Sequence, residues 1–171
     1  MYDPTVFENL KVAFENHVYD LDTIERKVII TNRIDRMDFA VMKREFAISF
    51  AHVDYQEVTA EIGLEASLKE LAAEILEWDN ENPGCQLTLR FHKRIHNVEE
   101  QCKRIQHILN AMWEDEHEVS QIISTFYGQE DEPYIDTIEV KFNEKLNEGH
   151  MGEIRGFIEH VLKSLEEIAK I

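Results

Sequence analysis

The chain has 171 residues, of which 43% are hydrophobic and 31% charged, the composition of a soluble globular protein with one hydrophobic core. Its 35 acidic and 18 basic residues give a formal net charge of -17 at pH 7. Such a surface repels the phosphate backbone, so we do not expect the protein to bind nucleic acid. No apolar run approaches the roughly 20 residues that span a bilayer, so we expect no membrane partner.

The cysteine content and the start of the chain both favour a cytoplasmic protein. Two cysteines, Cys85 and Cys102, are too few for a disulfide scaffold, and they do not form a CxxC pair. The first residues carry neither the basic segment nor the apolar run of a signal peptide.

The first third of the chain is expected to form a helix followed by strands. Apolar residues at helical spacing predict a first helix that ends near Asp22. Its expected inner face consists of Phe7, Leu10, Phe14, His17 and Leu21. Over residues 26–63 the apolar period changes to two, which predicts three antiparallel strands with turns near Asp35 and Asp54. Residues 35–45 also fit a short helix.

The remaining short elements follow the same two periodicities. Ser67 and Glu70 form the S-x-x-E capping box of a second helix. Alternating apolar residues predict a fourth strand at residues 87–95 and a fifth at residues 138–142. A strongly amphipathic final helix is expected over residues 153–170.

The longest regular pattern covers residues 97–127. Its first heptad positions are all apolar, namely Val98, Ile105, Met112, Val119 and Phe126. Asn97 and Glu100 supply the capping pattern at the start, so we expect one long helix. The helix would either project towards a partner or bend at the acidic run 114–116. β-Branched residues leave open a strand at 118–127, but the continuous heptad register favours the helix.

Together these elements predict one α+β domain spanning residues 1–171. It would contain a mainly antiparallel sheet of about five strands and four helices, of which the one over residues 97–127 is long. In the order of its elements this domain resembles small acidic chaperone and adaptor domains. The resemblance concerns element order alone and carries no residue motif.

One group of side chains has the composition of a metal site. His107 and Glu114 lie two turns apart on the expected long helix, and Glu114 neighbours His117. Zinc and manganese need three or four converging nitrogen or oxygen ligands, and this stripe supplies two or three. No HExxH motif accompanies them. A solvated helix face is the simpler interpretation, and a metal-dependent hydrolase that uses these three residues is the alternative.

Other chemical signatures are weak. The chain has no GxSxG, Walker or GxGxxG motif, so we expect no catalytic residue and no cofactor. Basic residues concentrate in two islands, 26–44 and 90–104, which would bind an anion or an acidic partner if they met. Ion pairing on strand faces is the simpler interpretation of these islands. If the acidic run 114–116 were buried, one of its carboxyl groups would suit a general acid or base, but a solvent-exposed bend is simpler.

The function expected from these features is protein binding without catalysis. Two strongly amphipathic helices and an acidic composition favour an intracellular adaptor, a small chaperone or an antitoxin-like inhibitor of a basic toxin. The partner would be another protein or a second copy of this chain. A homodimer through the helix at 97–127 is the specific form of that hypothesis.

Overall fold

The computed structural model describes residues 5–171 with the exception of residues 80, 115–116, 130 and 132. Within this part of the chain the strands form one antiparallel sheet of six strands in the order β1-β2-β3-β4-β6-β5. The strands are β1 (Val28–Asp38), β2 (Lys43–His52), β3 (Tyr55–Ala66), β4 (Gln86–Ile95), β5 (Glu118–Ser124) and β6 (Tyr134–Lys141). The helices are α1 (Val6–Thr23), α2 (Leu68–Ile75), α3 (Val98–Met112), the 3-10 helix η1 (Glu148–Glu153) and α4 (Ile154–Ala169).

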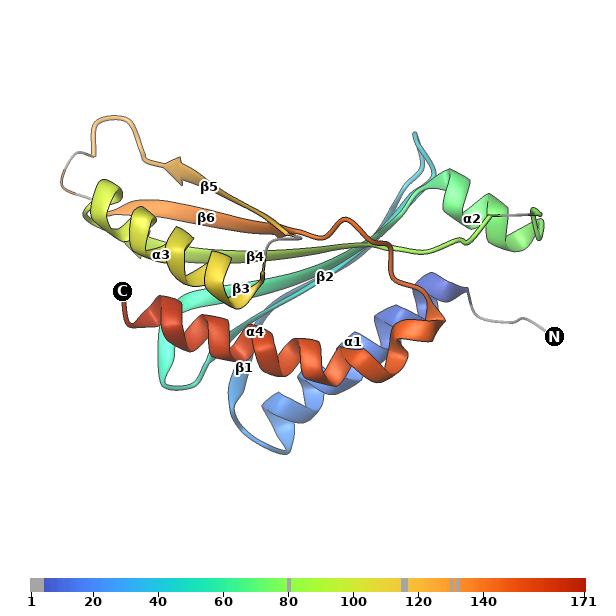
Figure 1. The fold of residues 1–171 in the computed structure, drawn as a ribbon, viewed down its shortest axis with the longest axis horizontal. Coiled ribbons are helices and arrows are strands. Elements are labelled where there is room, and N and C mark those ends of the chain that lie inside the picture. Colours follow the sequence, from blue (N-terminus) through green and yellow to red (C-terminus); the bar gives the residue numbers. More distant parts are fainter. Residues whose placement is uncertain (1–4, 80, 115–116, 130, 132) are drawn as a thin grey trace.

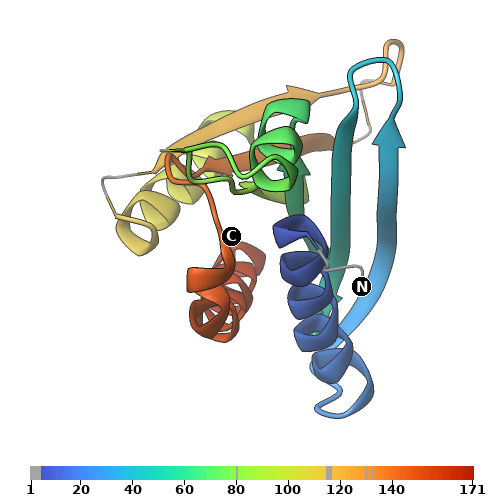
Figure 2. The same cartoon turned by 90° about the vertical axis from the view of Figure 1, so that its right-hand side faces the viewer.

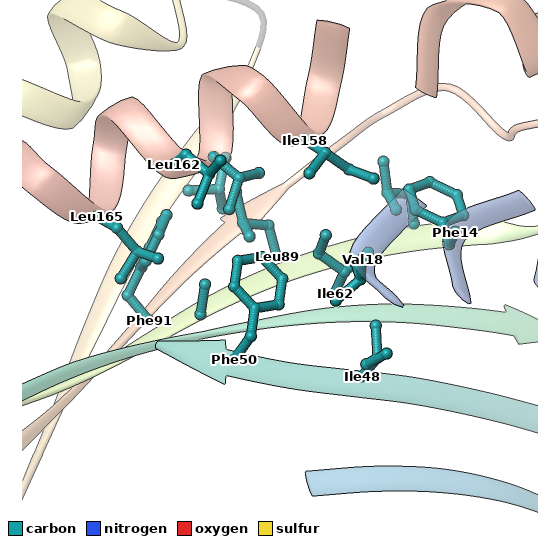
Figure 3. Close-up of a cluster of buried hydrophobic side chains, with 14 of the residues drawn as sticks. Phe14, Val18, Ile48, Phe50, Ile62, Leu89, Phe91, Ile158, Leu162 and Leu165 are labelled. Carbon is teal, nitrogen blue, oxygen red and sulfur yellow. The ribbon is translucent and has the colours of Figure 1, made fainter. Parts of the chain in front are cut away.

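The sheet is strongly bent, and α1, α3 and α4 cover its concave face (Figures 1 and 2). Helix α2 lies apart from them, at the end of the sheet where the β1–β2 hairpin turns (Figure 1). The core fills the space between the concave face and α1 and α4, as Figure 3 shows for Phe50, Leu89 and Leu165. Each such fully buried side chain contributes about 1.5–3 kcal/mol relative to an exposed one.

Strand register explains the alternation in the sequence. Ile48 of β2 lies opposite Ile62 of β3, which lies opposite Leu89 of β4, and all three are buried under the helices. The neighbouring row on the convex face is polar and runs through Ser49, Glu61, Arg90 and Glu139. One apolar and one polar face is the pattern of an antiparallel sheet that is covered on one side.

The predicted fold class is confirmed. The domain is α+β with an antiparallel sheet and four α-helices in the described part of the chain, and the sheet has six strands where about five were expected. The N-cap half of each predicted capping box is confirmed, because Ser67 accepts a hydrogen bond from the Glu70 N–H and Asn97 accepts one from the Glu100 N–H. The reciprocal half is not formed, since Glu70 accepts from the Gly84 N–H and the Asn97 N–H donates to Gln101.

The prediction of one helix over residues 97–127 is wrong in its second half. Helix α3 ends at Met112, and Trp113 is its C-cap. The next residue, Glu114, has a positive φ of 44°, a backbone conformation that ends helices. Residues Glu118–Ser124 then form β5, whose backbone groups pair with β6 at the edge of the sheet.

The apolar residues of this segment fit a strand as well as a helix, because residues four positions apart share a face in both. Val119 and Ile123, four residues apart, share one side of a strand as well as one face of a helix. Both are partly buried in β5, whereas Ile122 between them is 63% exposed. The premise of a projecting helix therefore does not hold, since α3 packs on the domain with Ile105 and Leu109 buried.

Two details of the predicted strand meander also change. The first turn lies at residues 39–42 instead of near Asp35, and Met42 adopts a positive φ of 54° there. The alternative of a short helix at residues 35–45 is wrong, because both sides of this turn continue the β1–β2 ladder. The turn predicted near Asp54 is confirmed.

No helix in the described part of the chain is long and apolar enough to cross a membrane.

Candidate functional site

The structure places the three residues predicted as a metal site in a helix, just after it and before a strand. His107 is exposed on α3, Glu114 is exposed just beyond the end of that helix, and His117 precedes β5. Among the described residues no group of three or more His, Cys, Asp and Glu side chains is placed to hold a metal ion. Of the predicted acidic run, residues 115–116 lie outside the described residues. The metal-dependent hydrolase therefore stays a prediction that this placement does not favour.

Ion pairs engage much of both basic islands. In the island at residues 26–44 the pairs run from the β1–β2 hairpin to α1 and β3, and in the island at 90–104 Arg90 bridges β3 and β6. Representative pairs are Arg33–Glu15, Arg44–Glu8, Lys43–Glu65, Arg90–Glu61 and Arg90–Glu139. These pairs fit the simpler interpretation, ion pairing on strand faces, better than an anion-binding surface.

A carboxyl group is buried beneath α3. Asp136 of β6 is fully buried, its Oδ2 accepts a hydrogen bond from the Cys102 thiol at 3.9 Å, and its Oδ1 has no partner among the described residues. Burial raises the pKa of Asp136 from its ordinary 3.8 to about 6. Lys93 lies opposite it in the β4–β6 register and is also buried, and burial lowers the pKa of its ammonium. No ion pair joins the two side chains. Because the pKa of Asp136 is raised in the folded state, this carboxyl group makes the stability of the domain depend on pH.

Helix α2 contacts the domain with a mixed side, on which Leu71 packs against the core beside two carboxylates. Its Ala73 is buried, and two carboxylates beside it accept hydrogen bonds from backbone groups of other segments. Glu74 accepts from the Val6 N–H at 2.7 Å, at the start of α1. Glu70 accepts from the Gly84 N–H at 2.9 Å and also pairs with Lys145. Burial would raise the pKa of Glu70, but the Lys145 ammonium and the Gly84 N–H together bring it below its ordinary value.

Other apolar residues of α2 and of the turn that follows it face solvent. Leu68 is 52% exposed, Ile75 69% and Trp78, just beyond the helix, 43%. The turn of the β1–β2 hairpin lies at the same end of the sheet and exposes Phe39, whose side chain is 80% accessible (Figures 1 and 2). We call this set the tip surface; it comprises Phe39, Val41, Met42, Leu68, Ile75, Leu76 and Trp78.

The charges around the tip surface are unbalanced. Its lysines are engaged, since Lys43 pairs with Glu45 and Glu65, and Lys69 pairs with Glu81. Asp38, Glu77 and Asp79 are exposed and have no ion-pair partner among the described residues. These three carboxylates neighbour Phe39, Leu76 and Trp78 in the sequence, and we call them the acidic rim of the tip surface.

A second feature is a cavity of about 530 Å³ between α1, α4 and the segment that connects β6 to α4. Eleven residues line it, namely Phe14, Leu87, His117, Phe142, Asn143, Glu144, Leu146, His150, Glu153, Ile154 and Phe157. Phe14, Leu87 and Ile154 are buried and form its floor, whereas Glu144 and Glu153 are exposed at its rim. The volume lies within the range of small-ligand pockets, about 300–1,000 Å³.

One polar atom in the wall of this cavity lacks a partner. The Nδ1 atom of His117 is buried and has no hydrogen-bond partner among the described residues. A buried polar atom left unpaired costs about 1–3 kcal/mol. The Nδ1 atom of His150, by contrast, accepts the Asn147 N–H at 3.0 Å. This nitrogen has almost no accessible surface, so it is an unpaired group within the wall and not one that faces the cavity.

Trp113 packs against Phe142 and Phe157, which form the aromatic wall of the cavity. Its ring meets Phe142 and Phe157 edge to face, each at 5.6 Å between centroids. Its indole N–H donates to the Ser164 hydroxyl at 3.0 Å, and that hydroxyl donates to the His160 carbonyl at 3.0 Å. The wall is thus held by a satisfied hydrogen-bond chain that ties the end of α3 to α4.

The sequence predicted parts of these two features and missed their assembly. The apolar face of α2 was visible as a stripe, but its outward direction was not. His117 was singled out as a possible ligand, whereas Phe142 and Phe157 carried no signal because each fits an ordinary amphipathic element. Comparison of the chain with protein-family models, with characterised proteins and with solved structures found no match. The function proposed below therefore rests on the geometry of the tip surface.

Proposed function

We propose that this protein is a non-enzymatic protein-binding module that holds an apolar, basic segment of another protein on its tip surface. The observation that carries the proposal is the orientation of α2, which is anchored through Glu70 and Glu74 and exposes Leu68 and Ile75. A helix that stabilised only its own domain would gain by turning that stripe inwards. Exposed apolar groups that gather in one place mark interaction surfaces.

The acidic rim favours a basic partner. Asp38, Glu77 and Asp79 are exposed next to Phe39, Leu76 and Trp78 in the sequence, and the whole chain carries a formal charge of -17. Complementary charge steers association and rejects acidic competitors. An adaptor, a small chaperone or an antitoxin-like inhibitor that acts in the cytoplasm fits this chemistry, and the free cysteines Cys85 and Cys102 are compatible with that compartment.

The homodimer expected through residues 97–127 has less support than a different partner. Helix α3 buries Ile105 and Leu109 in its own domain. Its outward side carries Lys103, Arg104 and His107, which are all exposed. We therefore propose a heterologous partner on the tip surface, with self-association as an alternative outcome that light scattering of the purified protein at high micromolar concentration detects.

The test compares variants on two exposed surfaces. In the first, Leu68→Asp and Ile75→Asp are combined on the tip surface. In the control, Ile122→Asp and Phe126→Asp are combined and add the same two charges in and just after β5, where the wild-type side chains are 63% and 67% exposed. Proteins cross-linked to the wild type in its native host should also be recovered with the control and be lost with the tip variant. Recovery of the same proteins with all three would contradict the proposal.

A further inference from the structure

We propose that the cavity between α1, α4 and the β6–α4 connection binds a small organic ammonium ion with an aromatic or aliphatic body. This site is separate from the tip surface, because none of the seven residues of that surface is among those that line the cavity. Binding of an ammonium ion in the cavity therefore does not depend on the proposed protein partner.

The floor of the cavity suits the apolar part of such a ligand. Phe14 and Leu87 are buried at its base, and the rings of Phe142 and Phe157 meet edge to face at 5.7 Å between centroids. Phe14 contacts Phe157 in the same manner at 6.0 Å. These rings leave apolar surface facing the cavity, and an aromatic or aliphatic group that covers it gains from the loss of water.

The rim of the cavity selects positive charge. Glu144 and Glu153 are its exposed charged residues, and no lysine or arginine is among the described residues that line it. The nearest cations along the chain are engaged elsewhere, because Lys145 pairs with Glu70 and Arg155 pairs with Glu159. An ammonium group at the rim would also be attracted by the faces of the phenylalanine rings. An anion of the same shape would meet two carboxylates and no cation.

The two rim carboxylates are the acceptors for such an ammonium group. A primary ammonium carries three N–H donors, and Glu144 and Glu153 offer carboxylate oxygens at the exposed edge of the cavity. His117 also lines the cavity, but its unpaired Nδ1 atom has almost no accessible surface, so we assign it no contact with the ligand.

Titration with a matched pair of probes tests the charge selection. We expect 2-phenylethylamine to bind with saturation at low salt and 3-phenylpropanoate, of similar shape and opposite charge, not to bind. The chain has two tryptophans, Trp78 on the tip surface and Trp113 behind the cavity wall, so each can be observed alone. In the Trp78→Phe variant the amine should change the fluorescence of Trp113. In the Trp113→Phe variant the fluorescence of Trp78 should stay constant.

Removal of the carboxylates tests the site itself. Glu144→Gln and Glu153→Gln should each weaken 2-phenylethylamine binding about two- to fivefold, and the combined variant about tenfold, since exposed ion pairs are individually weak. Both side chains are exposed, so the fold should persist, which circular dichroism verifies. Glu167→Gln on α4, which removes a carboxylate that pairs with Lys170 outside the cavity, should leave the affinity within about twofold.

Four outcomes would overturn the inference. They are equal binding of 3-phenylpropanoate, unchanged affinity in the Glu144→Gln, Glu153→Gln double variant, a response of Trp78 in place of Trp113, and absence of binding by the amine. A protein lysine offers the same ammonium chemistry, and N-acetyl-lysine methylamide distinguishes the two sources. Tighter binding of that amide than of 2-phenylethylamine would assign the site to a protein side chain and reject a small-molecule ligand.

Discussion

Helices α2 and α3 have the same local design and opposite orientations. Each begins with a side-chain cap, at Ser67 and Asn97, and each carries an apolar stripe. α3 buries Ile105 and Leu109 of its stripe in the domain. α2 anchors two carboxylates and Leu71 on the domain and exposes Leu68 and Ile75. Amphipathicity therefore tells which residues share a face, and the partners available to the polar groups decide which face turns inwards.

The largest expected effect contrasts the tryptophans that follow the two helices. Trp113 is 7% exposed and hydrogen-bonded to Ser164, whereas Trp78 is 43% exposed on the tip surface. Trp113→Ala should lower the free energy of unfolding by about 3–5 kcal/mol, because it leaves a cavity and removes the indole N–H that donates to the Ser164 hydroxyl. Trp78→Ala should change it by about 0.5 kcal/mol. Urea unfolding measures both, and comparable losses would show that α2 is packed as tightly as α3.

The second prediction concerns the carboxyl group buried beneath α3. The pKa of Asp136 is raised from 3.8 to about 6, so the native state holds its proton more tightly than the unfolded state. The resulting stability is fully present below pH 4 and is lost as pH rises through about 6. Asp136→Asn should therefore stabilise the protein by about 2–3 kcal/mol at pH 7–8 and leave it unchanged near pH 4. Urea unfolding across this range checks it, and a pH-independent difference would contradict it.

The carboxylate beneath α2 should respond to pH in the opposite sense. The pKa of Glu70 lies below its ordinary value of 4.5, because Lys145 and the Gly84 N–H offset the effect of burial. Its contribution is present above about pH 4.5 and is lost as pH falls. Glu70→Gln should cost about 1 kcal/mol at pH 7 and less at pH 3, which thermal unfolding at the two pH values measures. A loss that grows on acidification would mean that Lys145 and Gly84 do not stabilise this carboxylate.

The same comparison explains how far the sequence could predict the structure. Local signals were sufficient for both caps and for the alternation of β2, β3 and β4, because neighbouring residues determine them. They failed at β5, where Val119 and Ile123 fit a helix and a strand equally, and pairing with β6 decides the outcome. Neither the direction of α2 nor the cavity could be predicted. Both depend on contacts between segments far apart in the chain, such as Glu74 with Val6 and His117 with Phe142.

The smallest expected change in stability, that of Ile75→Ala, tests whether the exposed side chains of α2 are free to bind a partner. Ile75 of α2 is 69% exposed, so Ile75→Ala should change the free energy of unfolding by no more than about 0.5 kcal/mol. Ile105→Ala in α3, where the side chain is fully buried, should cost about 2–5 kcal/mol. If urea unfolding finds Ile75→Ala as costly as Ile105→Ala, the outward stripe belongs to the core and the tip surface is not free for a partner. If it finds the expected small change, loss of a partner in the tip variant reflects recognition, because the fold does not depend on this stripe.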